Sequence, residues 1–195
     1  VEWRVRTQTR SHHRHRSVGH EGLTGLISFA GITETAPSMR ILLVHCRYRS
    51  PSGEEAVVER EHSLLSDAGH DVERLEFSND RGRASAVDLA LAPANPRSAA
   101  RMRRAIERFR PDVVHVHNTW FAASPSVMST ARASGVPVVA TLHNYRAVCA
   151  GATLMRDGDA CFECLGGSVG PAVKHRCVND SLVQSMIGAS VVQVR

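Results

Sequence analysis

Four polar side chains stand directly behind an apolar stretch of the chain. The sequence GVPVVATL is followed by His143, Asn144, Tyr145 and Arg146. An imidazole at this place could donate a hydrogen bond to a hydroxyl or phosphate oxygen, and a guanidinium could pair with an acidic ligand through two parallel hydrogen bonds. The alternative is a capped loop whose polar groups bind backbone atoms. The sequence therefore predicts a polar site and leaves these two interpretations open.

Four of the five cysteines lie close together, with the spacing C-x11-C-x2-C-x12-C. One Cys-x-x-Cys pair with two flanking cysteines is compatible with a tetrahedral thiolate zinc site, in which His175 could replace one ligand. The glycine-containing loops between the cysteines show no apolar core of their own, and a metal would explain how they stay ordered. Free thiols and disulfides are the alternatives. The candidate zinc ligands are Cys149, Cys161, Cys164 and Cys177.

A third candidate position is the turn before a helical stretch that starts near residue 54. Gly53 would let backbone N–H groups approach a ligand, and a helix amino terminus favours an anion. Glu54 and Glu55 follow directly and would oppose a phosphate, although Arg47 could offset them. The alternative is a plain glycine turn in which the two acids stabilise the helix dipole.

Two histidines on one predicted strand form a further candidate group. His115 and His117 are two residues apart, so their side chains point to the same face of the strand, just before Asn118. Two such histidines could bind a metal, but no carboxylate or further histidine ligand lies near them in the sequence. We therefore interpret them as hydrogen-bonded residues at the edge of the core.

Alternating strands and helices must position all of these side chains. We expect strands at 40–46, 71–77, 112–117 and 136–142 and helices at 54–69, 96–110 and 124–135, with a further helical stretch at 181–195. This order predicts an α/β fold, a doubly wound parallel sheet with Rossmann-like connections and a cysteine-rich loop insertion. Ligands of such sheets bind beyond the carboxyl ends of the strands, where the polar residues above are found.

Apolar periodicity predicts which helix faces are buried. On helix 96–110 the residues Met102, Ile106 and Phe109 share one side. On helix 54–69 a face made of several apolar residues is expected to pack on the sheet, and Gly69 is expected to end the helix in a left-handed conformation. The residues of that second face are Val57, Leu64, Leu65 and Ala68. Cys46, within the first strand, is predicted to be a small core residue.

Composition and charge limit the function classes. The chain has 195 residues, enough for one ordinary domain, and a formal net charge of +5. The basic excess gathers in residues 1–21, so a general nucleic-acid-binding face is not expected. No apolar stretch approaches the roughly 18 residues of a spanning helix. We interpret residues 1–38 as a disordered basic leader. Because Met39 directly precedes the first strand, the alternative is that this leader is not native.

Three stretches of the chain resemble the amino-terminal domain of glycosyltransferase family 4. They are MRILLVHCRYRSPSGEEAVVEREHSLLSDAGHDVERLEF, RPDVVHVHN and GVPVVATLHNYRAVCAGATLMRDGDACFECL. The resemblance extends over residues 39–195, and the pattern HNYR…C…RDG…C..C is similar to one cysteine-containing subgroup.

The resemblance implies a fold and an activity. Members are retaining enzymes with two Rossmann-like domains, the GT-B fold, and they transfer a sugar from a nucleotide-sugar donor to an acceptor hydroxyl. The amino-terminal domain binds mainly the acceptor. His143 matches a catalytic histidine that faces the cleft, and Gly53 matches a glycine near the donor diphosphate. The resulting candidate substrate-binding and donor-binding residues are Gly53, Arg47, Asn118, Asn144, Tyr145 and Arg146.

The same resemblance implies partners and a location. No cofactor is expected for catalysis, so zinc would have only a structural role. We expect a sugar or a lipid-linked acceptor, a role in polysaccharide or glycoconjugate synthesis, and a cytoplasmic location with peripheral contact at the inner face of the membrane. The family's donor-binding carboxyl-terminal domain would follow residue 195. Transfer needs donor, acceptor and leaving-group stabilisation together, so we expect a truncated domain, 39–195, that is inactive alone.

Two other function classes remain open at this point. One is a zinc-stabilised, non-catalytic α/β binding module. The other is a flavodoxin-like nucleotide-binding domain of another enzyme class, which would bind a nucleotide without a second domain.

Overall fold

The computed structural model describes residues 37–48, 53–79 and 83–193. Residues 1–36, which make up nearly all of the predicted leader, lie outside the described residues. No helix in the described ranges is long and apolar enough to cross a membrane.

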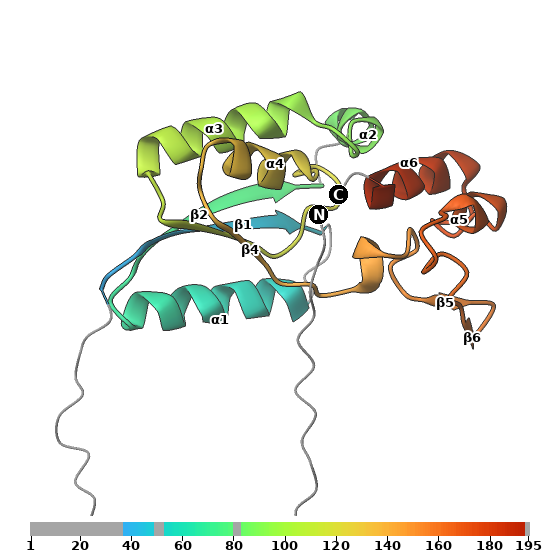
Figure 1. The fold of residues 1–195 in the computed structure, drawn as a ribbon, viewed down its shortest axis with the longest axis horizontal. Coiled ribbons are helices and arrows are strands. Elements are labelled where there is room, and N and C mark those ends of the chain that lie inside the picture. The colour runs from blue at the N-terminus through green and yellow to red at the C-terminus, as the bar shows by residue number, and fades with distance from the viewer. Residues whose placement is uncertain (1–36, 49–52, 80–82, 194–195) are drawn as a thin grey trace, which may run out of the picture. The chain divides into compact units, whose positions relative to one another are not determined.

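Among the described residues, four strands form one parallel sheet (Figure 1). The strands are β1 (Arg40–Arg47), β2 (Asp71–Ser78), β3 (Val113–Val116) and β4 (Val138–Ala140). Their order is β2-β1-β3-β4, and each neighbouring pair runs in parallel. This confirms the predicted parallel α/β sheet, which is consistent with the Rossmann-like half of a GT-B fold. The predicted strands are found within a few residues of their expected bounds.

Helices cover both faces of this sheet (Figure 1). The helix α1 (Gly53–Asp67) lies on one face, and α3 (Pro96–Phe109) and α4 (Ser126–Ala133) lie on the other. These three helices were expected from the sequence. A short helix, α2 (Arg83–Ala90), was not.

The apolar core lies between the sheet and α3 and α4. On α3, Met102, Ile106 and Phe109 are buried, as their spacing predicts. They pack with alternate residues of β1 and β3 and with buried residues of α4, because every second side chain of a strand faces the same side. Cys46, at the end of this row on β1, is fully buried, which confirms its prediction as a core residue.

The predicted packing face of α1 is wrong. Val57 and Leu64 are exposed, and Val58 is the buried apolar side chain among the described residues of this helix. The reason is that α1 turns a row of acidic side chains toward the sheet, and these pair with polar groups described below. The predicted end of the helix is confirmed, since Gly69 has φ +88° and the N–H of His70 donates to the carbonyl of Leu65 (3.1 Å).

The cysteine-rich segment, residues 145–193, follows β4 in the chain and forms a small packed unit. It contains the 3-10 turn η1 (Tyr145–Ala147), the antiparallel pair β5 (Met155–Arg156) and β6 (Asp159–Ala160), and the helices α5 (Gly170–Lys174) and α6 (Leu182–Gln193). The expectation that these loops have no core of their own is wrong. A second apolar cluster is made of Ala150, Val169, Ala172, Val178, Ala189 and Val192. Most of this cluster is supplied by helices α5 and α6 and their ends, and the residues are small.

Asn95 offers a test of how the fold is held together. Its side chain accepts hydrogen bonds from the backbone N–H groups of Arg97 (3.0 Å) and Ser98 (3.4 Å), and donates to Asp88 and to the carbonyl of Ala122. Because Asn95 is buried, Asn95→Ala removes the cap of α3 and leaves these groups without their bonds. We expect a loss of about 2 kcal/mol in the free energy of unfolding, measured with urea.

The control is Arg97→Ala on the same helical turn. Arg97 is exposed, so this change should alter the unfolding free energy by less than about 0.5 kcal/mol. Equal losses in the two variants would show that the Asn95 side chain does not cap α3.

Candidate functional site

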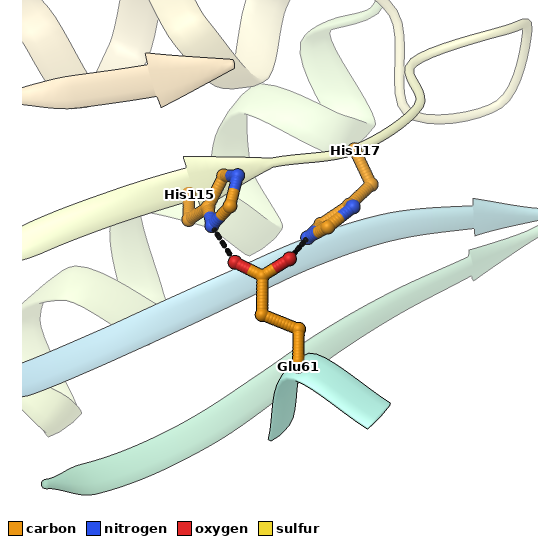
Figure 2. A group of neighbouring side chains, drawn as sticks. All are labelled: Glu61, His115 and His117. Atoms are coloured by element: carbon orange, nitrogen blue, oxygen red, sulfur yellow. Dashed lines mark ion pairs between the residues drawn. The ribbon is translucent and has the colours of Figure 1, made fainter. Parts of the chain in front are cut away.

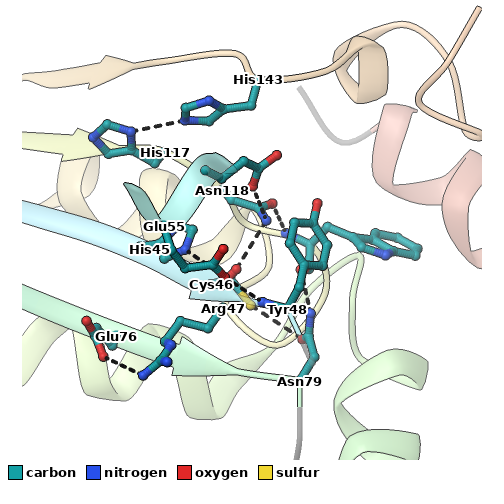
Figure 3. Close-up of polar contacts among 12 residues, drawn as sticks. His45, Cys46, Arg47, Tyr48, Glu55, Glu76, Asn79, His117, Asn118 and His143 are labelled. Atoms are coloured by element: carbon teal, nitrogen blue, oxygen red, sulfur yellow. Dashed lines mark hydrogen bonds and ion pairs between the residues drawn. The ribbon is translucent and has the colours of Figure 1, made fainter. Parts of the chain in front are cut away.

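The candidate site lies where the carboxyl ends of β1 and β3, the first turn of α1 and the loop after β4 come together (Figure 3). Parallel strands bring their carboxyl ends to the same edge of the sheet, so side chains far apart in sequence meet here. Asn118 and Asn144 are two of them, and both bind Glu54 of α1.

Glu54 connects three segments. Its carboxylate accepts a hydrogen bond from Asn118 Nδ2 (3.1 Å) and a longer one from Asn144 Nδ2 (3.5 Å). Asn118 Nδ2 also donates to the carbonyl of Cys46 at the end of β1 (3.1 Å). Burial raises the pKa of Glu54, while a charge on His143 and the hydrogen bonds from the two asparagines act in the opposite direction. The sequence presented this acid as an obstacle to phosphate binding or as a group that stabilises the helix dipole, not as a link between strand ends.

A second acidic residue of α1 holds the histidines of β3. Figure 2 shows Glu61 between His115 and His117, and its two carboxylate oxygens lie 2.6 Å from His115 Nδ1 and 3.3 Å from His117 Nε2. His115 Nε2 lies 2.8 Å from the hydroxyl oxygen of Thr141. The histidines are thus hydrogen-bonded at the core edge, as predicted. No carboxylate lies near them in the sequence, but Glu61 reaches them from α1, which is distant in sequence.

These three residues place a carboxylate oxygen and two imidazole nitrogens within 4.8 Å of one another. A metal ion could use such a set. Both ring nitrogens of His115 already have a partner, the carboxylate of Glu61 and the hydroxyl of Thr141. In the described contacts Glu61 orients the two imidazoles.

His117, oriented by Glu61, in turn contacts His143. His117 Nδ1 lies 3.1 Å from His143 Nε2, and the two rings are stacked with centroids 5.4 Å apart (Figure 3). Burial, together with the nearby imidazoles of His115, His143 and His45, lowers the pKa of His117 to about 4. His117 is therefore neutral near pH 7 and has one N–H.

The position of Glu61 determines where that N–H lies. The contact of His117 Nε2 with the carboxylate is not aligned as a hydrogen bond, but a bare nitrogen lone pair facing an anion would be repelled. We therefore assign the proton to Nε2, which leaves Nδ1 of His117 as an acceptor. His143 then donates from Nε2, and its Nδ1 is left to interact with another group.

The other residues of the loop after β4 have different environments. Asn144 Oδ1 accepts from the N–H of Arg146 (3.0 Å) and so caps η1. The guanidinium of Arg146 lies 4.0 Å from the ring centroid of Trp120 and donates to the carbonyl of Ala150 (2.7 Å). These contacts fit the alternative of a capped loop for Asn144 and Arg146. Tyr145 is exposed.

Two more candidates lie at the first loop. Gly53 is exposed at the first position of α1, and an added Cβ there would meet no described atom within 4 Å. Arg47 points to Glu76 of β2, with Nη1 3.8 Å from the carboxylate, instead of toward the acids of α1 (Figure 3). Glu55 is held by other groups, since it accepts from the N–H of Tyr48 (3.3 Å) and lies 3.8 Å from the buried His45.

The four clustered cysteines come together in space. All of them line one small cavity in the cysteine-rich segment, and all are free thiols. Burial raises the pKa of Cys164 and of Cys177. A thiol with a raised pKa is a poor nucleophile at neutral pH, so these two residues do not fit a catalytic role.

The fold and the site define an α/β protein that presents polar side chains at the carboxyl ends of parallel strands. Comparison with known families matches residues 38–179 to a glycosyl transferase 4-like domain, a stretch that includes every strand of the sheet and all four clustered cysteines. The chain therefore belongs to this glycosyl transferase 4-like family. Comparison with curated proteins and with solved structures gives no match.

The pKa of His117 leads to a prediction about stability. Its value in the folded protein, about 4, is below the usual 6.5, so between these values the unfolded chain binds a proton that the folded chain does not. The stability from His117 is complete at pH 7 and is lost as the pH falls through this window. From pH 7 to pH 5 we expect its contribution to the free energy of unfolding to fall by about 2 kcal/mol.

Urea unfolding at the two pH values measures this effect, with His117→Gln as the matched variant. That side chain does not titrate, so the variant should lose about 2 kcal/mol less than the parent chain over the same interval. The groups around His117 that also titrate are His45, His115, His143 and Glu61, and both proteins carry them. The same pH slope in both proteins would contradict a depressed pKa for His117.

Proposed function

We propose that this domain forms the acceptor side of a glycosyltransferase cleft and takes part in moving a sugar from a nucleotide-sugar donor to an acceptor hydroxyl. The observation that carries the proposal is the placement of His143. It stands at the carboxyl end of the sheet, within a family of glycosyl transferase 4-like domains, and its ring is oriented by the buried His117. The proposed product belongs to polysaccharide or glycoconjugate synthesis.

In this proposal His143 binds the reacting sugar. With Nε2 donating to His117, its Nδ1 is the atom that faces the ligand, either as an acceptor for a hydroxyl group or, once protonated, as a donor to an oxygen that gains negative charge. Asn118 and Asn144 keep the surrounding loops in place through Glu54. Gly53 would lie beside the donor diphosphate, where no described side chain would oppose a close approach.

The proposed division of labour leaves donor binding to a second domain. Transfer with retention of configuration needs the donor, the acceptor and the leaving group to be held at once. We therefore propose that this domain alone binds acceptors, binds nucleotide sugars weakly, and does not complete transfer. Sugars and lipid-linked sugars are the proposed acceptors, which would place the protein in the cytoplasm at the inner face of the membrane.

A second candidate is a binding module without catalytic function. The cavity lined by four cysteines favours it, because a metal there would stabilise the domain without taking part in a reaction. The two candidates differ in whether His143 contacts a ligand.

The test is a titration of the isotope-labelled chain, followed by the imidazole signals in NMR. The ligands are a panel of nucleotide sugars and a panel of mono- and disaccharides, free and linked to polyprenyl phosphate. We expect an acceptor to shift the His143 signals. We also expect His143→Ala to weaken its binding about tenfold, the effect of one hydrogen bond of roughly 1.4 kcal/mol.

The matched control is His62→Ala. His62 lies on α1 next to Glu61 but is not one of the grouped histidines His45, His115, His117 and His143. This change should leave acceptor binding unchanged. If no acceptor in the panel shifts His143, the binding-module candidate is favoured. Tight binding of a nucleotide sugar by this chain alone would contradict the proposed division between two domains.

A further inference from the structure

The cavity in the cysteine-rich segment is small and lined mostly by sulfur and apolar side chains. Its volume is about 20 Å³. A cavity needs roughly 10–15 Å³ to hold a single water molecule, so this one has room for a water molecule or an ion. It is lined by Cys149, Leu154, Met155, Arg156, Cys161, Cys164, Pro171, Ala172 and Cys177.

The four cysteines reach the cavity from four different places. Cys149 follows η1, Cys161 follows β6, Cys164 lies in the next turn, and Cys177 follows α5. None of them is in a disulfide, and none of the cavity-lining residues is a histidine or carboxylate that could act as a general base. Four thiols that line one small cavity, without a catalytic neighbour, are the ligand types of a structural metal site. No three of their sulfur atoms lie within 4.8 Å of one another, so metal binding would draw the sulfurs together.

The structure favours Cys177 as a ligand over the nearby His175. His175 Nε2 lies 3.4 Å from Glu163 Oε2, and His175 does not line the cavity. Cys177 does. The ligand set is therefore composed of sulfur alone, which a tetrahedral zinc ion accepts.

Arg156 is a hydrogen-bond donor beside the four thiols. Zinc with four thiolates carries a net charge of −2, and metal sites of this kind are surrounded by hydrogen-bond donors. Arg156 lines the cavity, and its Nη1 is buried with no hydrogen-bond partner among the described residues. Its Nη2 lies 2.6 Å from Glu163, which holds the guanidinium in place.

From these observations we propose a structural zinc site with Cys149, Cys161, Cys164 and Cys177 as its ligands and with Arg156 donating a hydrogen bond to the bound sulfurs. Its role is to hold the cysteine-rich segment together. The apolar cluster of this segment is made of alanine and valine side chains, which bury little surface, so a metal adds stability that the cluster does not supply.

The site also bears on the loop that carries His143. The N–H of Cys149 donates to the carbonyl of Tyr145 (2.8 Å), and Arg146 donates to the carbonyl of Ala150. A zinc ion bound to Cys149 would therefore fix the far end of the His143 loop without touching the site.

The first experiment measures metal in the full chain, purified without chelator, by mass spectrometry. We expect about one zinc per chain, retained on gel filtration. In the native protein the buried thiol of Cys46 should remain free of metal, and after removal of zinc under denaturing conditions all five cysteines should react as thiols. Less than about half an equivalent of zinc, one equivalent of iron instead, or two disulfides in the thiol count would each overturn the proposal.

Variants then identify the ligands. Cys161→Ser should reduce the zinc content at least tenfold, whereas His175→Ala should keep one zinc per chain. Cys46→Ala is the matched control for loss of a cysteine, because Cys46 is buried in the main core, and it should also keep its zinc. Loss of zinc in the Cys46 or His175 variant, or full zinc in the Cys161 variant, would contradict the assignment.

A measurement on the unchanged chain covers the case in which Cys161→Ser does not fold. Zinc is replaced by Co²⁺, and the visible absorption spectrum reports the ligands. Tetrahedral cobalt with four thiolates gives intense sulfur-to-metal charge-transfer bands and strong d–d bands. A spectrum typical of six-coordinate oxygen ligands would show that the cysteines do not form the site.

Discussion

The need to pair partly buried carboxylates governs the arrangement of this domain. A carboxylate taken out of water without a partner is costly, and α1 turns three of them toward the sheet. Each finds its partner at a different place: Glu54 at the two asparagines, Glu55 at the N–H of Tyr48, and Glu61 at the histidines of β3. Val58 is the buried apolar residue among them. In this respect α1 differs from α3, which packs through a continuous apolar side.

Packing through paired polar groups fixes the position of α1 on the sheet. A helix held by apolar contacts can shift by a small amount and keep most of its buried surface. A helix held by paired polar groups leaves donors and acceptors unpaired when it shifts, so a fully satisfied network specifies one position. Asn118 illustrates this, because its single amide group binds both the end of β1 and Glu54. The strand ends that form the candidate site are thus tied to α1 directly.

Much of the fold could be predicted from the sequence, because apolar runs and helix ends are local signals. Met102, Ile106 and Phe109 recur at helical spacing, and Gly69 marks the end of α1. The inner face of α1 could not be predicted in this way. Periodicity counts apolar residues, and here the side facing the sheet is acidic, so Val57 and Leu64 were placed inside by mistake. The elements β5 and β6 are two residues long each and leave no periodic pattern to detect.

The candidate site was predicted in its location more than in its contacts. The polar residues after β4 lie at the expected edge of the sheet, but their roles are divided by partners far away in the sequence. Arg146 is held by Trp120, Arg47 by Glu76, and the histidines of β3 by Glu61. A single sequence shows which residues could do chemistry, and it does not show which of them are already engaged with one another. For the cysteines, the spacing suggested one common site among several alternatives, and all four line one cavity.

The loop that carries His143 is held at both ends. At its start, the N–H of Thr141 donates to the carbonyl of Val116 (2.9 Å), and at its end Arg146 and Cys149 tie it to the cysteine-rich segment. A side chain on such a loop keeps its orientation without a ligand, so little conformational entropy remains to be lost on binding. His117 then determines which nitrogen of His143 is available. The orientation of one imidazole thus depends on the sheet, on α1 and on the cysteine-rich segment together.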